Sequence, residues 1–176
     1  MKRIITSDAI AQGAAGFTAG QSLLFSGTVY TARDAAHKRI AEAALSGGEL
    51  PFNLEGAVIY YSGATPAPPG MPIGSCGPTT SGRMDPYTPR LLEQGLAAMI
   101  GKGERNDAVC AAIWQYGALY FCAVGGAGAL AARCVTACEE IAFRGLGCES
   151  VKRLEIREFP LILAIDALGG NLFMRA

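Results

Sequence analysis

Two short segments of this 176-residue chain combine residue types that bind anions. The first contains Arg33 and Asp34 and opens a stretch, residues 32–45, with helical periodicity. The N-terminus of a helix offers free N–H groups and a partial positive charge, so an arginine beside it strengthens a site for an anion. In the plainer interpretation Thr31 caps the helix and Arg33 is a solvated surface residue. The sequence leaves both interpretations open.

Two residues near Arg33 are candidate supporting residues. Asp34 follows it directly, and His37, the single histidine of the chain, follows it by four positions. Residues four apart lie on the same face of a helix, so His37 could contact the anion site. The interpretation that we favour for His37 is a structural histidine with satisfied hydrogen bonds.

The second segment ends a loop that is rich in glycine and proline. Thr79, Thr80 and Ser81 stand between glycines, where hydroxyl and backbone N–H groups can surround an anion. Arg83 follows, and its planar guanidinium suits a carboxylate that accepts two hydrogen bonds. The alternative is a plain turn after which Asp85 caps a helix. The density of polar groups at one bend favours a functional site, in which Ser81 and Asp85 are candidate supporting residues.

Two further glycine-containing segments carry less information. Lys102 stands between Gly101 and Gly103, so its backbone can approach a ligand closely, although such triplets often mark plain turns. Residues 126–131 match the G-x-G-x-x-A turn of dinucleotide-binding proteins. That motif needs an acidic residue at the end of the next strand about 20 residues on, whereas Glu149 precedes a strand. We therefore disfavour nucleotide binding.

Alternating strands and helices must position these segments. We expect strands at residues 2–6, 21–26, 57–61, 99–103, 119–124, 153–166 and 172–173, and helices at residues 32–45, 88–98 and 108–116 and after residue 126. Residues 62–82 hold five glycines and five prolines, which excludes a regular element. The apolar Met71, Ile73 and Cys76 favour an ordered, partly buried loop there. The pattern predicts one α/β domain over residues 1–176 with a mixed sheet, because the C-terminal run looks like hairpins.

Composition argues against several classes of protein. Fifteen basic and 15 acidic residues give zero net charge, so we expect binding neither to nucleic acid nor to an anionic membrane. A hydrophobic content of 51% excludes disorder. Residues 108–132 carry no charge, but glycines interrupt them, so we expect a helix–strand–helix unit rather than a membrane span. The first residues lack the apolar stretch of a signal peptide, which predicts a cytoplasmic protein.

The six cysteines do not form a recognisable metal-binding pattern. No pair has the C-x-x-C spacing, and His37 is far from all of them in sequence, so we expect this chain itself to bind no metal or cluster. Most of the cysteines stand among apolar residues, where a cysteine acts as a small core residue.

Taken together, these segments resemble the beta region of the iron–sulfur hydro-lyases, which are the class I fumarases and the L-tartrate dehydratases. Residues 26–39, 77–85 and 100–103 carry the resemblance, and residues 124–127 and 155–160 fit the same pattern in the expected order. It covers nearly the whole chain. The resemblance implies a swivelling β/β/α domain, here as a separate beta subunit.

The resemblance also implies a partner and a cofactor. In some members of that family the beta region is fused behind an alpha domain, and in others it is a separate beta subunit. In the separate arrangement the alpha subunit holds a [4Fe-4S] cluster, the beta subunit holds none, and the two chains form an α2β2 heterotetramer with the active site between them. The substrate is a small dicarboxylate. We expect the reversible hydration of fumarate to (S)-malate ahead of the dehydration of L(+)-tartrate. A dicarboxylate-binding module without catalysis is the alternative from another functional class.

The family pattern assigns roles to Arg33, Arg83, Thr79 and Lys102, and Thr80 is a further candidate. Arg33 and Arg83 would bind the substrate carboxylates, together with Thr80. Thr79 would be the catalytic base, and Lys102 would be a further catalytic contact. Since a threonine is a poor base at its normal pKa, Thr80 or Ser81 could share that role.

Overall fold

The computed structural model describes residues 3–13 and 16–174. Its strands are β1 (Arg3–Thr6), β2 (Ser22–Thr31), β3 (Val58–Tyr60), β4 (Ala98–Gly101), β5 (Leu119–Cys122), β6 (Val135–Ala142) and β7 (Val151–Ile165). Its α-helices are α1 (Ser7–Ala11), α2 (Asp34–Ser46), α3 (Thr88–Glu93), α4 (Asp107–Tyr116) and α5 (Gly128–Cys134). Two 3-10 helices are η1 (Ser81–Met84) and η2 (Arg144–Glu149).

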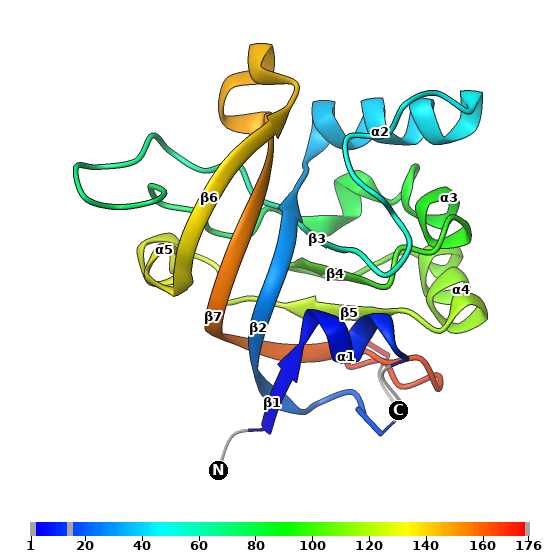
Figure 1. Ribbon diagram of the computed structural model, residues 1–176. Coiled ribbons are helices and arrows are strands. Elements are labelled where there is room, and N and C mark those ends of the chain that lie inside the picture. Colours follow the sequence, from blue (N-terminus) through cyan, green and yellow to red (C-terminus); the bar gives the residue numbers. More distant parts are fainter. Residues whose placement is uncertain (1–2, 14–15, 175–176) are drawn as a thin grey trace.

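The strands form two layers, and α2, α3 and α4 form a third (Figure 1). β1, β2, β7 and β6 make one curved layer, and β3, β4 and β5 cross behind it. The strand order is β1-β2-β3-β4-β5-β7-β6, and β2 also pairs with β7, so the sheet closes on itself. β1 to β5 pair in parallel, whereas β7 is antiparallel to β2, β5 and β6. The expected α/β class, mixed sheet and β/β/α arrangement are confirmed.

The middle layer is buried on both faces. Along β3, Val58 and Tyr60 point into a core shared with β2 and β7, whereas Ile59 points into a core shared with α2, α3 and α4. In β4, Ile100 points into the first of these cores and Met99 into the second. Successive residues of a strand point to opposite faces, so a strand that is covered on both sides is apolar throughout. This double burial explains why β3, β4 and β5 are short continuous apolar runs.

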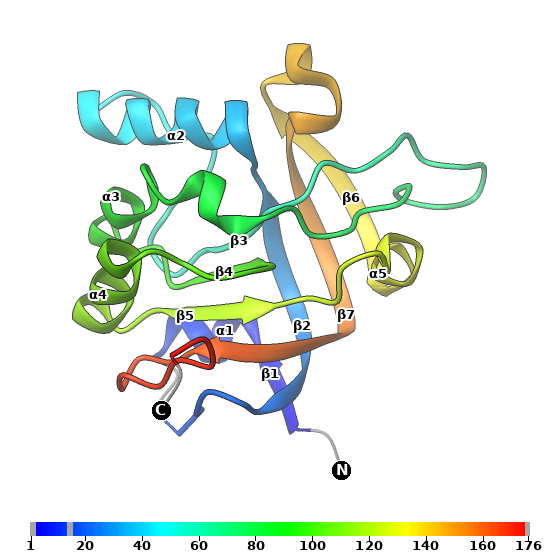
Figure 2. The same cartoon turned by 180° about the vertical axis from the view of Figure 1, so that it is seen from behind.

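The loop between β3 and η1 is ordered, as the sequence predicts. Ile73 and Cys76 are buried, although Met71 is 40% exposed. Tyr60 donates its hydroxyl hydrogen to the Cys76 carbonyl oxygen, and the Cys76 N–H donates to the Gly128 carbonyl oxygen at 3.2 Å. These bonds tie the loop to the sheet and to the start of α5, beside which it extends in Figure 2.

Three predicted elements are wrong in extent or type. The strand predicted at residues 21–26 continues to Thr31 as β2. The helix predicted at residues 88–98 ends at Glu93, because Gly95 has a φ of 92° and the chain then turns into β4. The strand predicted at residues 172–173 is a turn, in which the Phe173 N–H donates to the side-chain oxygen of Asn171 at 2.9 Å. Asparagine favours such turns because its side chain can bond to the backbone N–H two residues further on. That N–H is then not available to a neighbouring strand.

One α-helix and one strand are absent from the sequence-based prediction, as are the 3-10 helices η1 and η2. α1 has five residues, and β6 is an edge strand of the sheet. Glu139 and Glu140 are both exposed in β6, so it lacks the alternation that marks a half-buried strand. Charged residues on an edge strand discourage pairing with other chains, which accounts for this composition.

The long uncharged segment, residues 108–132, folds into α4, β5 and the first part of α5. The predicted helix–strand–helix unit is therefore confirmed. Within residues 3–13 and 16–174, no helix is both long enough and apolar enough to cross a membrane.

Candidate active site

The predicted site residues lie at one edge of the structure. β2, β3, β4 and β5 are parallel, so their carboxyl ends meet at the same edge. Arg33 follows β2, Thr79 ends the loop after β3, Lys102 follows β4 and Gly125 follows β5. In α/β folds, whether the sheet is open or closed, ligands bind outside the carboxyl ends of the parallel strands. The topology thus brings together segments that are far apart in sequence.

Arg33 is held by two acidic side chains. Its Nε donates to Asp34 Oδ2 at 3.0 Å and lies 3.3 Å from Glu149 Oε1. Its aliphatic part packs on Gly63, where a Cβ atom would lie 3.0 Å from Arg33 Cδ. The guanidinium therefore has support along its Nε edge and along its stem.

The structure contradicts the interpretation in which Thr31 caps α2. Thr31 is buried, and its hydroxyl accepts a hydrogen bond from the Lys152 N–H at 3.0 Å. Arg33 occupies the N-cap position without a side-chain cap of its own. Glu149 Oε2 instead accepts from the Ala35 N–H at 3.1 Å, so a residue from η2 satisfies the first turn of the helix.

Asp34 connects Arg33 to Arg83. The same oxygen, Asp34 Oδ2, accepts from Arg83 Nη2 at 2.7 Å, and Arg83 Nη2 also donates to Thr79 Oγ1 at 2.8 Å. The predicted carboxylate ligands and the predicted base thus lie in one hydrogen-bonded chain. Asp34 therefore contacts both predicted carboxylate ligands, and its supporting role stays a prediction.

The backbone of Lys102 is held beside Thr79 and Thr80 by hydrogen bonds. It forms a parallel bridge with Thr80, and the Ser81 N–H donates to the Lys102 carbonyl oxygen at 2.9 Å. The Thr79 N–H donates to the Tyr61 carbonyl oxygen at 2.8 Å, which fixes the bend to the end of β3. The Lys102 side chain runs over Gly125, where a Cβ atom would lie 3.6 Å from its Cδ.

The arrangement suits a carboxylate ligand. Among the described residues, Nη1 and Nη2 of Arg33 and Nε and Nη1 of Arg83 make no hydrogen bond. The side chains of Arg33 and Arg83 are 27% and 48% exposed, so these donors are accessible. Paired guanidinium N–H groups match the two oxygens of a carboxylate. The roles of the individual residues remain predictions.

Ser81 and Asp85 lie behind this surface rather than on it. Ser81 is fully buried, and its hydroxyl accepts from the Tyr120 hydroxyl at 2.8 Å and from the Lys102 N–H at 3.1 Å. Asp85 accepts from Arg105 Nε at 2.6 Å and is also buried. Asp85 therefore does not cap α3, and neither residue is accessible to a ligand.

His37 does not reach the site, so the expected contact is wrong. It is fully buried and packs edge-on against Tyr61, with 5.4 Å between the ring centroids. Arg33 is the N-cap and lies outside the helix, so the four-residue spacing does not put the two on one face. The favoured structural role agrees with this burial, but within the described residues neither ring nitrogen of His37 has a hydrogen-bonding partner, so the expected hydrogen bonds are wrong. Burial, aided by the Arg105 charge, lowers the pKa of His37 to about 3.

Gly128, in the segment that matches the dinucleotide-binding turn, has a packing role. A Cβ atom on Gly128 would lie 2.2 Å from Ser75 Oγ and 2.9 Å from the backbone nitrogen of Gly77. Close approach of α5 to the glycine- and proline-rich loop therefore requires glycine at this position. Gly126 instead has a φ of 77°, which favours glycine, so both glycines have a structural explanation.

The cysteines do not fit an iron–sulfur cluster held by this chain. Across residues 3–13 and 16–174, no three His, Cys, Asp or Glu side chains are grouped to hold a metal ion. Cys76 and Cys110 are buried, Cys122, Cys134 and Cys138 are half-buried, and Cys148 is exposed. Burial raises the pKa of the Cys76 thiol to about 12, as is typical of a cysteine that packs in a core.

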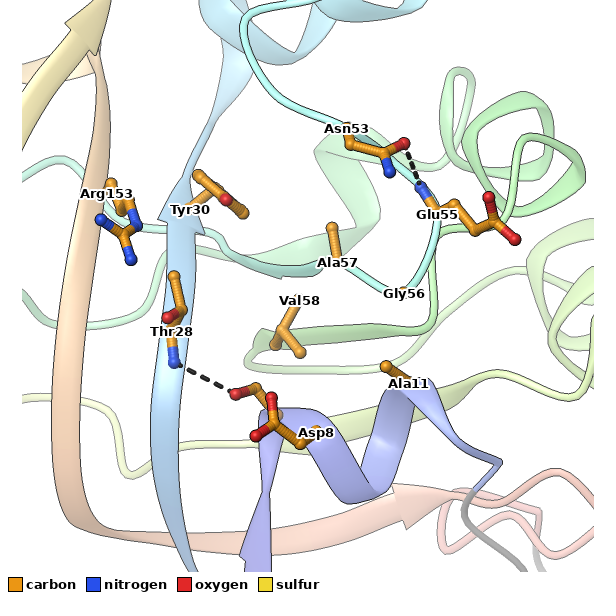
Figure 3. A pocket seen from close by; sticks show the side chains of 11 residues that line it. Asp8, Ala11, Thr28, Tyr30, Asn53, Glu55, Gly56, Ala57, Val58 and Arg153 are labelled. Carbon is orange, nitrogen blue, oxygen red and sulfur yellow. Dashed lines mark hydrogen bonds between the residues drawn. The ribbon is translucent and has the colours of Figure 1, made fainter.

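A separate hollow of about 220 Å³ lies where β3 begins, away from the carboxyl edge (Figure 3). Asp8, Thr28, Glu55 and Arg153 are among the residues that line it. Its polar groups are partly engaged locally, as in the hydrogen bond from the Glu55 N–H to Asn53 Oδ1 at 3.1 Å. None of the predicted site residues lines this hollow.

Sequence similarity to fumarate hydratases extends over most of the chain. Fumarate hydratase 1, mitochondrial, of Leishmania major is 37% identical over 153 residues, which cover 86% of this chain and 28% of that protein. The anaerobic class I fumarate hydratase of Escherichia coli strain K12 is 36% identical over 155 residues, which cover 87% of this chain and 28% of that protein. The chain thus spans less than a third of the length of these relatives.

Sequence similarity to a tartrate dehydratase subunit extends over most of the length of both chains. The L(+)-tartrate dehydratase subunit beta of Escherichia coli strain K12 is 32% identical over 177 residues, which cover 98% of this chain and 87% of that subunit. The family model described as Fumarase C-terminus matches residues 2–176. This match and these relatives show that the chain belongs to the fumarase C-terminus family of hydro-lyases.

Proposed function

We propose that this chain is the beta subunit of a hydro-lyase that reversibly hydrates fumarate to (S)-malate. The observation that carries the proposal is the convergence of Arg33, Arg83 and Thr79 through Asp34 at the carboxyl edge of the sheet. Two arginines with accessible donors suit a substrate with two carboxylates. The fumarate hydratases among the relatives support this substrate.

The chemistry of dehydration requires positive charge at this place. Loss of water from (S)-malate begins at the carbon beside one carboxylate, and removal of its proton creates additional negative charge there. Arg33, Arg83 and Lys102 would stabilise that charge more strongly than they bind the substrate, which is what lowers a barrier. Removal of one such donor typically lowers kcat by about 10²–10³.

Thr79 is the proposed base. Its Oγ1 accepts a hydrogen bond from the charged Arg83 Nη2 at 2.8 Å. A hydrogen bond that favours the charged form lowers a pKa, so this contact reduces the cost of forming an alkoxide. Thr80 is exposed one residue further on and is the proposed additional ligand of the substrate.

The proposal includes a partner subunit. The candidate site is open on one side, and a relative of similar length is named as a subunit beta. In our proposal an alpha subunit covers the carboxyl edge, holds the [4Fe-4S] cluster and assembles with this chain as α2β2. The residues of this chain then act in substrate binding and in the transfer of the proton.

L(+)-tartrate is the second candidate substrate. It also carries two carboxylates, and the tartrate dehydratase subunit beta matches this chain over 87% of its own length. The same arginines would serve either substrate. A dicarboxylate-binding module without catalysis is the third candidate, because the accessible arginine donors require only a carboxylate.

The test uses the complex of this chain with its cluster-bearing subunit, purified without oxygen. Fumarate, (S)-malate and L(+)-tartrate are assayed side by side. Thr79→Ala should lower turnover by about 10² or more, as loss of a general base does, while dicarboxylate binding persists. Thr136→Ala removes an exposed hydroxyl from β6 and serves as the matched control. Near-normal turnover of Thr79→Ala would refute its assignment, and a complex that binds but never turns over dicarboxylates would favour the third candidate.

A further inference from the structure

Glu149 is an acidic residue that the proposed reaction does not use, yet it contacts the site. It lies at the end of η2, and its side chain is 22% exposed. One carboxylate oxygen lies 3.3 Å from Arg33 Nε, and the other accepts from the Ala35 N–H at 3.1 Å. Glu149 thus links the start of α2 to the guanidinium of Arg33.

We propose that Glu149 and Asp34 are positioning residues that set the orientation and spacing of the two substrate-binding arginines. This inference rests on the proposed function of that site. It concerns residues of this chain alone and does not involve the cluster.

The first argument is the way in which the acids share Arg33. Both approach its Nε, so the terminal Nη1 and Nη2 remain without a hydrogen bond among the described residues. Gly63 closes the space behind the stem, since a Cβ atom there would lie 3.2 Å from Arg33 Nη1. A long, flexible side chain is thereby held in one orientation, with its terminal donors free for a carboxylate.

The second argument is continuity. Asp34 Oδ2 accepts from Arg33 Nε at 3.0 Å and from Arg83 Nη2 at 2.7 Å. Glu149, Arg33, Asp34, Arg83 and Thr79 therefore form an unbroken chain of polar contacts. A diacid has a fixed distance between its carboxylates, so the spacing of the arginines also fixes where its carbon atoms lie relative to Thr79.

The third argument is charge. The carboxylates of Asp34 and Glu149 balance the guanidinium groups of Arg33 and Arg83. The ammonium group of Lys102 then gives this group of five side chains a net charge of plus one. Neutralising either acid raises that net charge by one and should favour binding of any dianion. The same change frees an arginine to move, and a misplacement of about 1 Å can cost about 10²-fold in rate. Binding and turnover should therefore change in opposite directions.

The experiment compares Asp34→Asn and Glu149→Gln with the wild type in the complete complex. We expect kcat to fall by about 10–10²-fold while KM becomes lower. Glu42→Gln is the matched control, because Glu42 lies on α2 and, among the residues that the structure describes, pairs with the exposed Lys38 alone. Loss of folded protein alone would lower the apparent kcat without lowering KM. If kcat and KM of both variants stay within twofold of the wild type, the inference is overturned.

A second measurement does not depend on turnover. The Nε–H proton of Arg33 should give a slowly exchanging NMR signal in the wild-type chain and in Glu42→Gln, and exchange at least tenfold faster in Glu149→Gln. Equal exchange in all three proteins would overturn the inference. If the wild-type complex turns over no dicarboxylate, the proposed function fails. The NMR signal of Arg33 and the binding of succinate, a dicarboxylate that cannot lose water, still show whether Asp34 and Glu149 position the arginine.

Discussion

Replacing Asp85 by asparagine should destabilise the chain strongly, because it breaks a buried ion pair. The side chains of Arg105 and Asp85 are 0% and 6% exposed. Both carboxylate oxygens are used, since Oδ1 accepts from Arg105 Nε at 2.6 Å and Oδ2 accepts from the Asn106 N–H at 2.8 Å. Asparagine offers one acceptor and one NH₂ group, so a donor would face a donor on one side.

The magnitude follows from the burial of the charge that remains. Arg105 would keep its hydrogen bond to Thr88 Oγ1 at 2.9 Å and its contacts with the rings of Tyr61 and Tyr120, but no carboxylate would balance it. Breaking a buried pair in this way costs ~3–5 kcal/mol. For a chain of this length each kcal/mol shifts the Tm by about 2–4 °C, so the Tm should fall by about 6–20 °C.

Thermal unfolding followed by circular dichroism measures this loss, and urea unfolding gives the free energy directly. The control is Glu93→Gln, which breaks the exposed pair between Arg90 and Glu93 and should cost less than ~1 kcal/mol. If Asp85→Asn costs no more than Glu93→Gln, the buried pair does not hold this region together. The consequence for function is direct, because Asp85 follows the short helix η1 that carries Arg83.

Two further predictions concern residues that lie behind the candidate site, Gly101 and His37. Gly101→Ala should cost about 1–3 kcal/mol in unfolding free energy, because its Cβ would lie 2.0 Å from the buried Ser81 Oγ, whereas a Cβ on Gly145 meets open space. Urea unfolding of Gly101→Ala and Gly145→Ala tests this, and equal stabilities would contradict it. The pKa of His37 is lowered from 6.5 to about 3, so the unfolded chain binds a proton there at a higher pH than the folded chain does. Its contribution to stability is therefore full above pH 6.5 and falls by about 1.4 kcal/mol per pH unit towards pH 3. His37→Phe should flatten the pH dependence of the unfolding free energy in that window, and an unchanged slope would show that other groups cause it.

The sequence predicts those features of this fold that local chemistry determines. The strands at β3, β4 and β5 are recognisable because they are buried on both faces, and α2 is recognisable by its small residues and its glycine stop. Arg33, Thr79 and Lys102 could be singled out because each follows a strand and stands among residues of unusual type. Parallel pairing then brings them to one edge without any further information.

The partners that come from distant elements could not be predicted in this way. Glu149 contacts Arg33 from η2, which is more than a hundred residues further along the chain, and no local pattern marks it. Asp85 resembles a helix cap in sequence but pairs with Arg105, whose burial follows only from the packing of α3 and α4. The face on which His37 lies was assigned wrongly because helical spacing begins after Arg33. Side chains that hold the site from behind are therefore defined by the tertiary fold.

The exposure of the arginine side chains determines how strong their ionic interactions are. Pairs between side chains as exposed as Arg83 and Asp34, at 48% and 34%, are worth only ~0–1 kcal/mol, because water screens them. When a second surface excludes water, the effective dielectric constant falls and the same charges interact several times more strongly. A hydro-lyase needs this increase, since the charge formed on proton removal must be stabilised more than the substrate is. In the proposed complex the alpha subunit therefore supplies more than a cluster: by covering the carboxyl edge it strengthens the interactions that Arg33, Arg83 and Lys102 make with the reacting dicarboxylate.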